Sequence, residues 1–159
     1  METYIYLNGW KENLRFSSAH VIPEYEKCGR LHGHTYAVHV KIYGKPDNKG
    51  IILDFSIVKE FLKNIIKLID HKILIPKNSK IAEIIIDGKN INMKTLGKNY
   101  YFPIEDCVLL PISSTSAEKL SEYILDIFIN KLKKYDNIEK MELGIDEGFG
   151  QGARVTKIL

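Results

Sequence analysis

The chain has 159 residues, of which 45% are apolar and 27% are charged, as in an ordinary globular protein. This length predicts a single domain over 1–159 with its own core, and a net charge of +3 is too small to require a nucleic-acid partner. No apolar run is long enough for a membrane span, no signal peptide is expected, and two cysteines make no disulfide framework. We therefore expect a cytoplasmic protein without a membrane partner.

Alternating and β-branched segments fill the first part of the chain. We expect strands over 4–7 and 10–19, joined at Asn8-Gly9, which is a strong signal for a tight type I′ hairpin. A polar loop over about 21–31 follows. The β-branched and aromatic segment 35–43 predicts the next strand.

The hydrophobic period changes after residue 54. Apolar residues recur at helical spacing from Phe55 to Ile69, with lysines between them, so we expect an amphipathic helix capped by Asp54 or Ser56. Residues 80–110 then read as an insertion with its own β-hairpin around a turn at Asp87-Gly88.

A second helix is expected from Thr115 to Leu132, because Thr115 and Glu118 have the spacing of a capping box. Strands over 140–145 and 153–158 close the chain around a glycine-rich turn. Regular alternation of strands and helices is absent, so the order of elements predicts an α+β fold with an antiparallel sheet.

Three of the five histidines fall between positions 20 and 34. His32 and His34 are two apart, so on a strand both side chains leave the same face, and His20 ends an earlier strand-like segment that can lie opposite them. Three imidazoles are a frequent catalytic zinc set that leaves a fourth position open, and the sequence therefore predicts a zinc site. His39 has the opposite parity and is not expected to be a ligand.

Cys28 lies four residues before His32 in a polar loop. A lone cysteine is most often a small buried apolar residue, but nearby cations and a metal favour a reactive thiolate. We therefore interpret Cys28 as a catalytic base. Cys107 lies in an apolar segment and is expected in the core.

Several other polar residues have both a structural and a functional interpretation. Asp70-His71 at the end of the first helix favours the helix C-terminus, or forms a carboxylate–imidazole pair for proton transfer. Thr115 and Glu118 have the capping box as an ordinary explanation. Glu147 is either a turn carboxylate or a group that accepts two neighbouring N–H donors from a heterocycle.

Taken together, these segments resemble the 6-pyruvoyl-tetrahydropterin synthase superfamily, and within it the 6-carboxy-tetrahydropterin synthases. The resemblance covers about 16–71 and 111–158, and the N-terminal hairpin and the 80–110 insertion depart from the compact family form. The matching segments are Phe16-Ser17-Ser18-Ala19-His20, Cys28 with His32-Gly33-His34, Ile51-Ile52-Leu53-Asp54-Phe55, Leu68-Ile69-Asp70-His71, Thr115-Ser116-Ala117-Glu118 and Glu147.

The resemblance implies a tunnelling fold, in which an antiparallel sheet carries two helices on one face. Subunits of this fold assemble into a closed barrel, commonly a homohexamer of two stacked trimers, with active sites at subunit interfaces. Barrel closure also has a physical reason, because it removes exposed sheet edges.

The resemblance also implies a substrate, 7,8-dihydroneopterin triphosphate, and a role for each matching residue. By this likeness, His20, His32 and His34 hold zinc. Cys28 removes a side-chain proton, and Asp70 with His71 returns protons. The pterin is anchored by one carboxylate with three helping residues: Glu147, helped by Thr115, Ser116 and Glu118.

Three residues between the cysteine and the His-Gly-His segment resemble the 6-carboxy enzymes, which release acetaldehyde and triphosphate for the 7-deazaguanine nucleosides queuosine and archaeosine. The 6-pyruvoyl enzymes typically have four, and this activity is the alternative. A folate-pathway variant has glutamate in place of the cysteine. Cys28 opposes that variant, although Glu24 and Glu26 lie near enough for a mixed activity. An alternative of another class is a non-catalytic zinc-containing pterin-binding protein.

Overall fold

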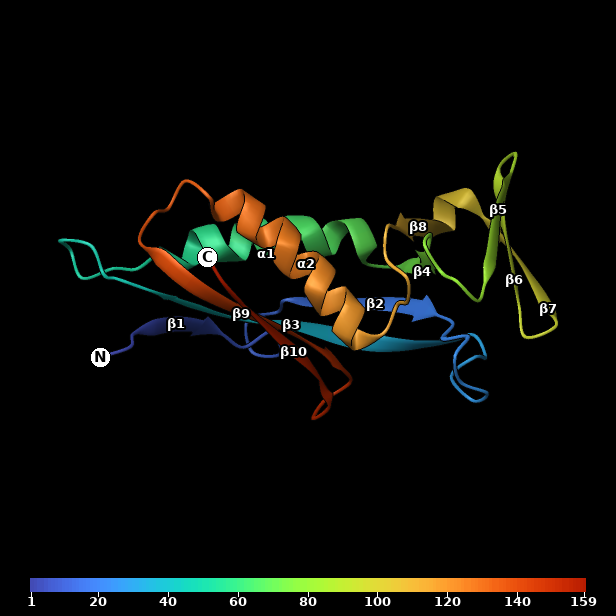
Figure 1. Cartoon of the computed structure of the whole chain (residues 1–159), viewed down its shortest axis with the longest axis horizontal. Coiled ribbons are helices and arrows are strands. Elements are labelled where there is room, and N and C mark those ends of the chain that lie inside the picture. Colours follow the sequence, from blue (N-terminus) through green and yellow to red (C-terminus); the bar gives the residue numbers. More distant parts are fainter.

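A computed structural model of residues 1–159 contains a seven-stranded sheet with two helices on one face and a separate three-stranded sheet at one end (Figure 1). This arrangement confirms the expected α+β class. The helices are α1 (Phe55–Ile69) and α2 (Ala117–Leu132), with a 3-10 turn η1 (Ile104–Asp106). The strands are β1 (Tyr4–Leu7), β2 (Arg15–His20), β3 (His32–Gly44), β4 (Lys72–Pro76), β5 (Glu83–Asp87), β6 (Asn90–Thr95), β7 (Lys98–Pro103), β8 (Cys107–Leu110), β9 (Ile138–Glu147) and β10 (Gly152–Ile158).

The main sheet has the order β10-β9-β3-β2-β4-β8, with β1 also paired to β3. The strands β10, β9, β3 and β2 are antiparallel neighbours, as expected. β4 and β8 are parallel to their neighbours, so the sheet is mixed rather than wholly antiparallel. Both parallel pairs join strands that are not consecutive in the chain, because β3 and α1 lie between β2 and β4, and the inserted sheet lies between β4 and β8.

The predicted hairpin at Asn8-Gly9 is wrong. β1 and β2 do not pair with each other. Both pair with β3, which is long enough to hold them end to end along one edge. Asn8 instead makes a local turn in which its side chain accepts a hydrogen bond from the Trp10 amide. Gly9 is needed for close approach, because a Cβ there would overlap the Val38 carbonyl oxygen.

The helices cover one face of the main sheet because their apolar stripes match its even-numbered residues on β3. Asp54 caps α1 by accepting a hydrogen bond from the Ser56 amide at 2.7 Å, which settles the choice between the two candidate caps. The buried stripe of α1, which includes Val58 and Leu62, shares a core with Tyr36, Val38 and other inward residues of β3. α1 ends at Ile69 with Asp70 as its C-cap, and β4 begins two residues later at Lys72.

The predicted insertion forms β5, β6 and β7, a three-stranded antiparallel sheet that contains the expected hairpin as β5 and β6. The turn of this hairpin is one residue later than predicted, at Gly88-Lys89, because Asp87 is the last residue of β5 and pairs with Asn90, and Gly88 has φ 59. A second turn, at Leu96-Gly97, was not predicted. One face of this sheet contributes Ile91, Met93 and Phe102 to a small second core. The apolar segment at Cys107, at the end of the expected insertion, joins the main sheet as β8.

The predicted capping box is wrong by one residue. The cap of α2 is Ser116, whose hydroxyl accepts a hydrogen bond from the Lys119 amide at 3.4 Å. Thr115 is fully buried and its hydroxyl has no hydrogen-bond partner. Its backbone carbonyl lies against His20, as described below. Glu147 ends β9 rather than lying in the following turn.

Candidate metal centre and its pocket

The register of two strands brings the three histidines together. His20 on β2 lies directly opposite His32 on β3, and Ser18 lies opposite His34. Alternation along the strands points all three imidazoles to the helix-covered face. Ligand atoms of the three side chains lie within 4.8 Å of one another, so the cluster can hold a metal ion.

Backbone carbonyls fix the orientation of two imidazoles. His20 Nδ1 lies 3.0 Å from the Thr115 carbonyl oxygen, and His32 Nδ1 lies 2.7 Å from the Arg30 carbonyl oxygen. A carbonyl oxygen only accepts, so each Nδ1 carries the proton and each Nε2 presents a lone pair. These two Nε2 atoms are 3.1 Å apart, and the Nε2 of His34 is buried without a partner. A cation between these nitrogens would satisfy all three.

The cluster contains no carboxylate and favours neutral imidazoles. Burial, with a smaller contribution from the neighbouring His32 and His34, lowers the pKa of His20 to about 4 against the opposing hydrogen bond to Thr115. Burial also lowers the pKa of His34. Neutral imidazole is the form that coordinates metals, so the donor set fits a metal ion without prior loss of protons.

Beside the histidines lies a pocket of about 380 Å³, called the thiol pocket here because Cys28 lines it. The loop after β2 supplies Cys28, the start of α2 supplies Ser116 and Glu118, and the end of β9 supplies Glu147. Cys28 is exposed. The fold therefore gathers residues far apart in sequence around the metal cluster, with a thiol and two carboxylates on its wall.

Glu147 lies next to β3, where its backbone pairs with Tyr36. Burial raises the pKa of its carboxyl group, and the charge of Glu118 raises it further, while His32 lowers it. A half-buried carboxylate of this kind gains from ligand N–H donors that replace lost water.

Thr115 does not line the pocket, and its contact with the site is made through His20. Its carbonyl oxygen accepts the hydrogen bond from His20, and the residues that follow it line the pocket. The sequence placed Thr115 beside the ligand, whereas the observed contact orients a metal-binding imidazole.

The pair Asp70–His71 lies elsewhere in the subunit. His71 Nδ1 is 2.9 Å from Asp70 Oδ1, and the His71 side chain is 83% exposed. Both residues are tied to β2, because the Ser17 amide donates to Asp70 Oδ1 and the His71 amide donates to the Ser17 carbonyl. Burial raises the pKa of Asp70, but the bonds from Ser17 and His71 outweigh it and leave the pKa below its usual value.

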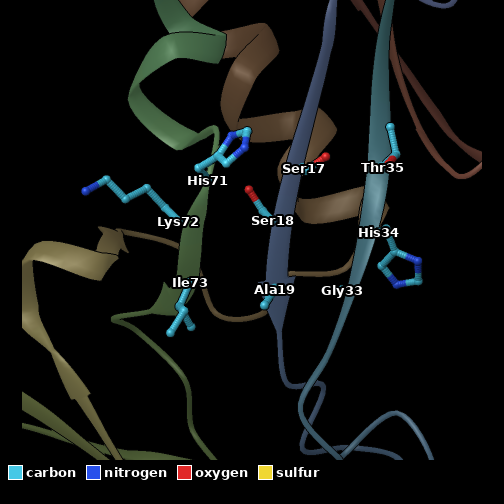
Figure 2. A pocket seen from close by; sticks show the side chains of 9 residues that line it. All are labelled: Ser17, Ser18, Ala19, Gly33, His34, Thr35, His71, Lys72 and Ile73. Carbon is cyan, nitrogen blue, oxygen red and sulfur yellow. The ribbon is translucent and has the colours of Figure 1, made fainter.

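His71 lines a second pocket, of about 480 Å³, which is distinct from the thiol pocket although His34 lines both. Figure 2 shows His71 at the start of β4 and His34 on β3, with β2 between the two strands. Cys28 and Glu147 do not line this second pocket. One subunit therefore does not bring Cys28 and His71 to the same pocket.

His39 lies on the opposite face of β3, as its parity predicts. Its Nδ1 accepts a hydrogen bond from the Gly9 amide, and its Nε2 lies 2.9 Å from Asp146 Oδ2. Trp10 Nε1 and Arg154 also donate to this carboxylate, at 2.8 and 2.7 Å. This histidine is held by protein groups alone.

Sequence reasoning missed several residues at the site. Tyr36 is fully buried, stacks on Phe16 and places its hydroxyl 3.3 Å from His20 Nδ1. Its even position on the strand of His32 and His34 was a usable signal. Tyr25 and Gln151 line the thiol pocket from loops, where no periodic pattern could have identified them.

Comparison with known proteins extends these observations. The family model described as 6-pyruvoyl tetrahydropterin synthase matches residues 10–157. A protein of Methanocaldococcus jannaschii is 41% identical over 156 residues, which is 96% of each chain, and its provisional name is 6-carboxy-5,6,7,8-tetrahydropterin synthase. An Aquifex aeolicus protein named 6-carboxy-5,6,7,8-tetrahydropterin synthase is 28% identical over 129 residues, covering 79% of this chain and 73% of its own.

Solved structures have the same fold, including the inserted region. The 6-pyruvoyl tetrahydropterin synthase of Plasmodium falciparum superposes with a TM-score of 0.89 at 30% identity, covering 99% of both chains. The Plasmodium vivax enzyme gives the same TM-score at 29% identity, over 100% of this chain and 99% of its own. Two variants of the P. vivax protein replace a catalytic glutamate by cysteine or alanine. In the present chain, neither helix has the length and apolar character to span a bilayer.

Proposed function

This chain belongs to the 6-pyruvoyl tetrahydropterin synthase family, and from that premise we propose that it is a zinc-dependent 6-carboxy-5,6,7,8-tetrahydropterin synthase. The proposed reaction converts 7,8-dihydroneopterin triphosphate and water to 6-carboxytetrahydropterin, acetaldehyde and triphosphate. The product would serve 7-deazaguanine biosynthesis in the cytoplasm. One observation carries the proposal: three histidines, a thiol and a carboxylate share one pocket.

Zinc is the metal we assign to His20, His32 and His34. Zinc–nitrogen bonds of about 2.0–2.1 Å place two tetrahedral ligand atoms about 3.3 Å apart, near the 3.1 Å between the Nε2 atoms of His20 and His32. An all-imidazole set also suits zinc better than the hard cations that prefer oxygen. When bound, zinc would polarise the side-chain oxygens of the substrate.

Cys28 is the proposed base. Of the three candidate bases in its loop, it lines the pocket, whereas Glu24 and Glu26 do not. Its thiolate would take a proton from a side-chain carbon of the substrate, and a positioned base of this kind accelerates a reaction by about 10²–10⁴-fold. The three-residue spacing to His32 supports the 6-carboxy activity over the 6-pyruvoyl one.

Glu147 is the proposed pterin anchor. Its carboxylate can accept two parallel N–H bonds from the ring, and Ser116 and Glu118 stand on the same wall. Partial burial strengthens such bonds by removing competing water. We assign Thr115 a supporting role through its bond to His20.

We further propose a homo-oligomer, a hexamer by family likeness, with active sites shared between subunits. Asp70 and His71 would return protons to the substrate, but within one subunit His71 lines a different pocket from Cys28 and Asp70 lines neither pocket. A neighbouring subunit can supply the pair if the sheet edges at β8 and β10 join in a ring.

A complementation experiment tests shared sites. Cys28→Ala and His71→Ala subunits, each inactive alone, are mixed, unfolded and refolded together. Shared sites predict that mixed oligomers recover turnover that neither parent has. Light scattering that finds an active monomer would contradict the oligomer proposal.

The proposed reaction is tested by mass spectrometry of products formed from dihydroneopterin triphosphate. We expect 6-carboxytetrahydropterin together with acetaldehyde. A 6-pyruvoyl product that retains all side-chain carbons would favour the alternative that the Plasmodium structures represent. Tight pterin binding without any product would favour the non-catalytic pterin-binding alternative.

A further inference from the structure

We propose that the inserted sheet is a positioning device for Cys28, and that Leu96 at its β6–β7 turn is the residue that holds the thiol-bearing loop. This inference rests on the proposed role of Cys28 as the base. It assigns a task to the insertion, which none of the metal, pterin or proton-transfer roles uses.

The loop that carries Cys28 has little support of its own. From Glu24 to Leu31 every residue is exposed except Gly29. Turn-like backbone bonds give it shape: the Ile22 amide donates to the Cys28 carbonyl at 2.9 Å, and the Gly29 amide donates to the Tyr25 carbonyl at 2.7 Å. Such a loop needs an external contact to hold a side chain in one place.

Gly29 is where that contact is made. A Cβ at this position would overlap the Leu96 Cδ1 methyl on one side and the Tyr25 carbonyl oxygen on the other. Leu96 therefore packs directly on the backbone next to Cys28. In Figure 1 the loop after β2 and the three-stranded sheet lie at the same end of the molecule.

Leu96 makes this contact in an unfavourable backbone conformation. Leu96 has φ 51 and Gly97 has φ 71, so both central residues of the turn between Thr95 and Lys98 are left-handed. Such type I′ turns favour Asn-Gly, whereas a bulky side chain is unfavourable in the left-handed conformation because its Cβ crowds the following carbonyl oxygen. Because no turn requirement explains a leucine here, its contact with Gly29 is the reason we infer.

The insertion also holds the other end of the loop. Val21, which follows the metal ligand His20, is buried in the small core with Ile91 and Met93 of β6. The stretch from Val21 to Gly29 is thus attached to the insertion at both ends. Displacement of the inserted sheet would move Cys28 while the strand-borne histidines stay in place.

The test is Leu96→Asn in the full-length, zinc-loaded protein. Asparagine suits the left-handed turn, so the insertion should keep or gain thermal stability, while the apolar contact with Gly29 is lost. We expect kcat to fall by about 10–100-fold through misplacement of Cys28, with KM and zinc content unchanged. Leu96→Met, which restores an apolar side chain of similar reach, should recover most of the rate.

Ile86→Asn is the matched control, because Ile86 is also about half exposed, at 55% against 49%, and lies near the other turn of the same sheet. It should leave kcat unchanged. An unchanged kcat in Leu96→Asn, or an equal loss in the control, would overturn the positioning role.

Hydrogen exchange gives a readout that does not need turnover. In Leu96→Asn, peptides covering 21–31 should exchange several-fold faster, whereas peptides covering β3 should not change. Unaltered exchange over 21–31 would overturn the proposal. If wild type forms no product from dihydroneopterin triphosphate, the proposed function fails, and this exchange result still decides whether Leu96 holds the loop.

Discussion

β3 carries histidines on both of its faces, and the two sets have opposite environments. On the helix-covered face, His32 and His34 meet His20 with no carboxylate among them. On the other face, His39 is bonded by the Gly9 amide and by Asp146, which Trp10 and Arg154 also bind. In the first set the Nε2 atoms of His20 and His32 face each other and that of His34 has no partner, whereas both ring nitrogens of His39 have protein partners.

This difference distinguishes a cluster that can hold a metal ion from a histidine that is bonded to protein groups alone. Because Gly9 donates to His39 Nδ1, His39 must donate from Nε2 to Asp146, and every polar atom of its ring is satisfied. Burial lowers the pKa of His39, and the charge of Asp146 opposes this only in part. The histidines on the helix-covered face instead point lone pairs at one another.

The strongest test of this comparison is metal content. We expect about one zinc per subunit in wild type and almost none in His32→Ala or His34→Ala, because each removes one of three ligands. His39→Ala, from the same strand and the opposite face, should keep its zinc. Atomic absorption measures the zinc content of wild type and of the three variants. Full zinc content in both His32→Ala and His34→Ala would contradict the assignment.

The next largest effect concerns the thiols. Cys28→Ala should fold, keep its zinc and lose about 10²–10⁴-fold in kcat, since it removes the proposed base. Cys107→Ala is the matched control. Burial and the nearby Asp106 raise the pKa of Cys107 to about 11, so it has little thiolate at neutral pH. A wild-type rate in Cys28→Ala would direct attention to Glu24 and Glu26.

Much of this comparison could be predicted from the sequence, because it depends on strand parity. A period of two separates His39 from His32 and His34 without knowledge of the partner strand. The N-cap of α1 could also be narrowed to Asp54 or Ser56 from the sequence, because both lie at the start of a strongly periodic segment. Local patterns of this kind are reliable because the strand and helix periods decide which side chains face the core.

The errors arose where distant segments compete with local signals. Asn8-Gly9 has strong turn chemistry, yet β3 offers both flanking strands a longer partner. Thr115 and Ser116 are both good caps, and the sequence does not reveal that the Thr115 carbonyl binds the distant His20 while Ser116 caps the helix. Leu96-Gly97 escaped notice because leucine is a poor turn residue and its reason lies in the Cys28 loop.

The two faces also differ in their glutamates on β9. Glu147→Gln should weaken pterin binding about tenfold, because an amide N–H would face a ligand donor and leave it unpaired at about 1–3 kcal/mol. Glu142 lies on the face of the sheet opposite the helices, called the open face here, where it pairs with Lys41 at 3.2 Å. Glu142→Gln should therefore not affect pterin binding. Calorimetry with a pterin compares them. Loss in Glu142→Gln alone would mean that the wrong carboxylate was chosen.

The smallest effect on the site should come from Asp146→Asn, which breaks the structural cluster of the open face. Burial raises the pKa of Asp146, but the bonds from Trp10 and Arg154 and the nearness of His39 outweigh it, so its folded pKa lies below the usual 3.8. A depressed pKa means that its stabilisation is complete above the unfolded pKa and is lost as pH falls through the folded one. Wild type should therefore exceed Asp146→Asn in unfolding free energy at pH 7, with the gap narrowing below about pH 4. Urea unfolding at the two pH values measures this, and zinc content at pH 7 should match wild type. A gap that stays constant into acid would show that Asp146 stabilises the open face by packing rather than by its charge.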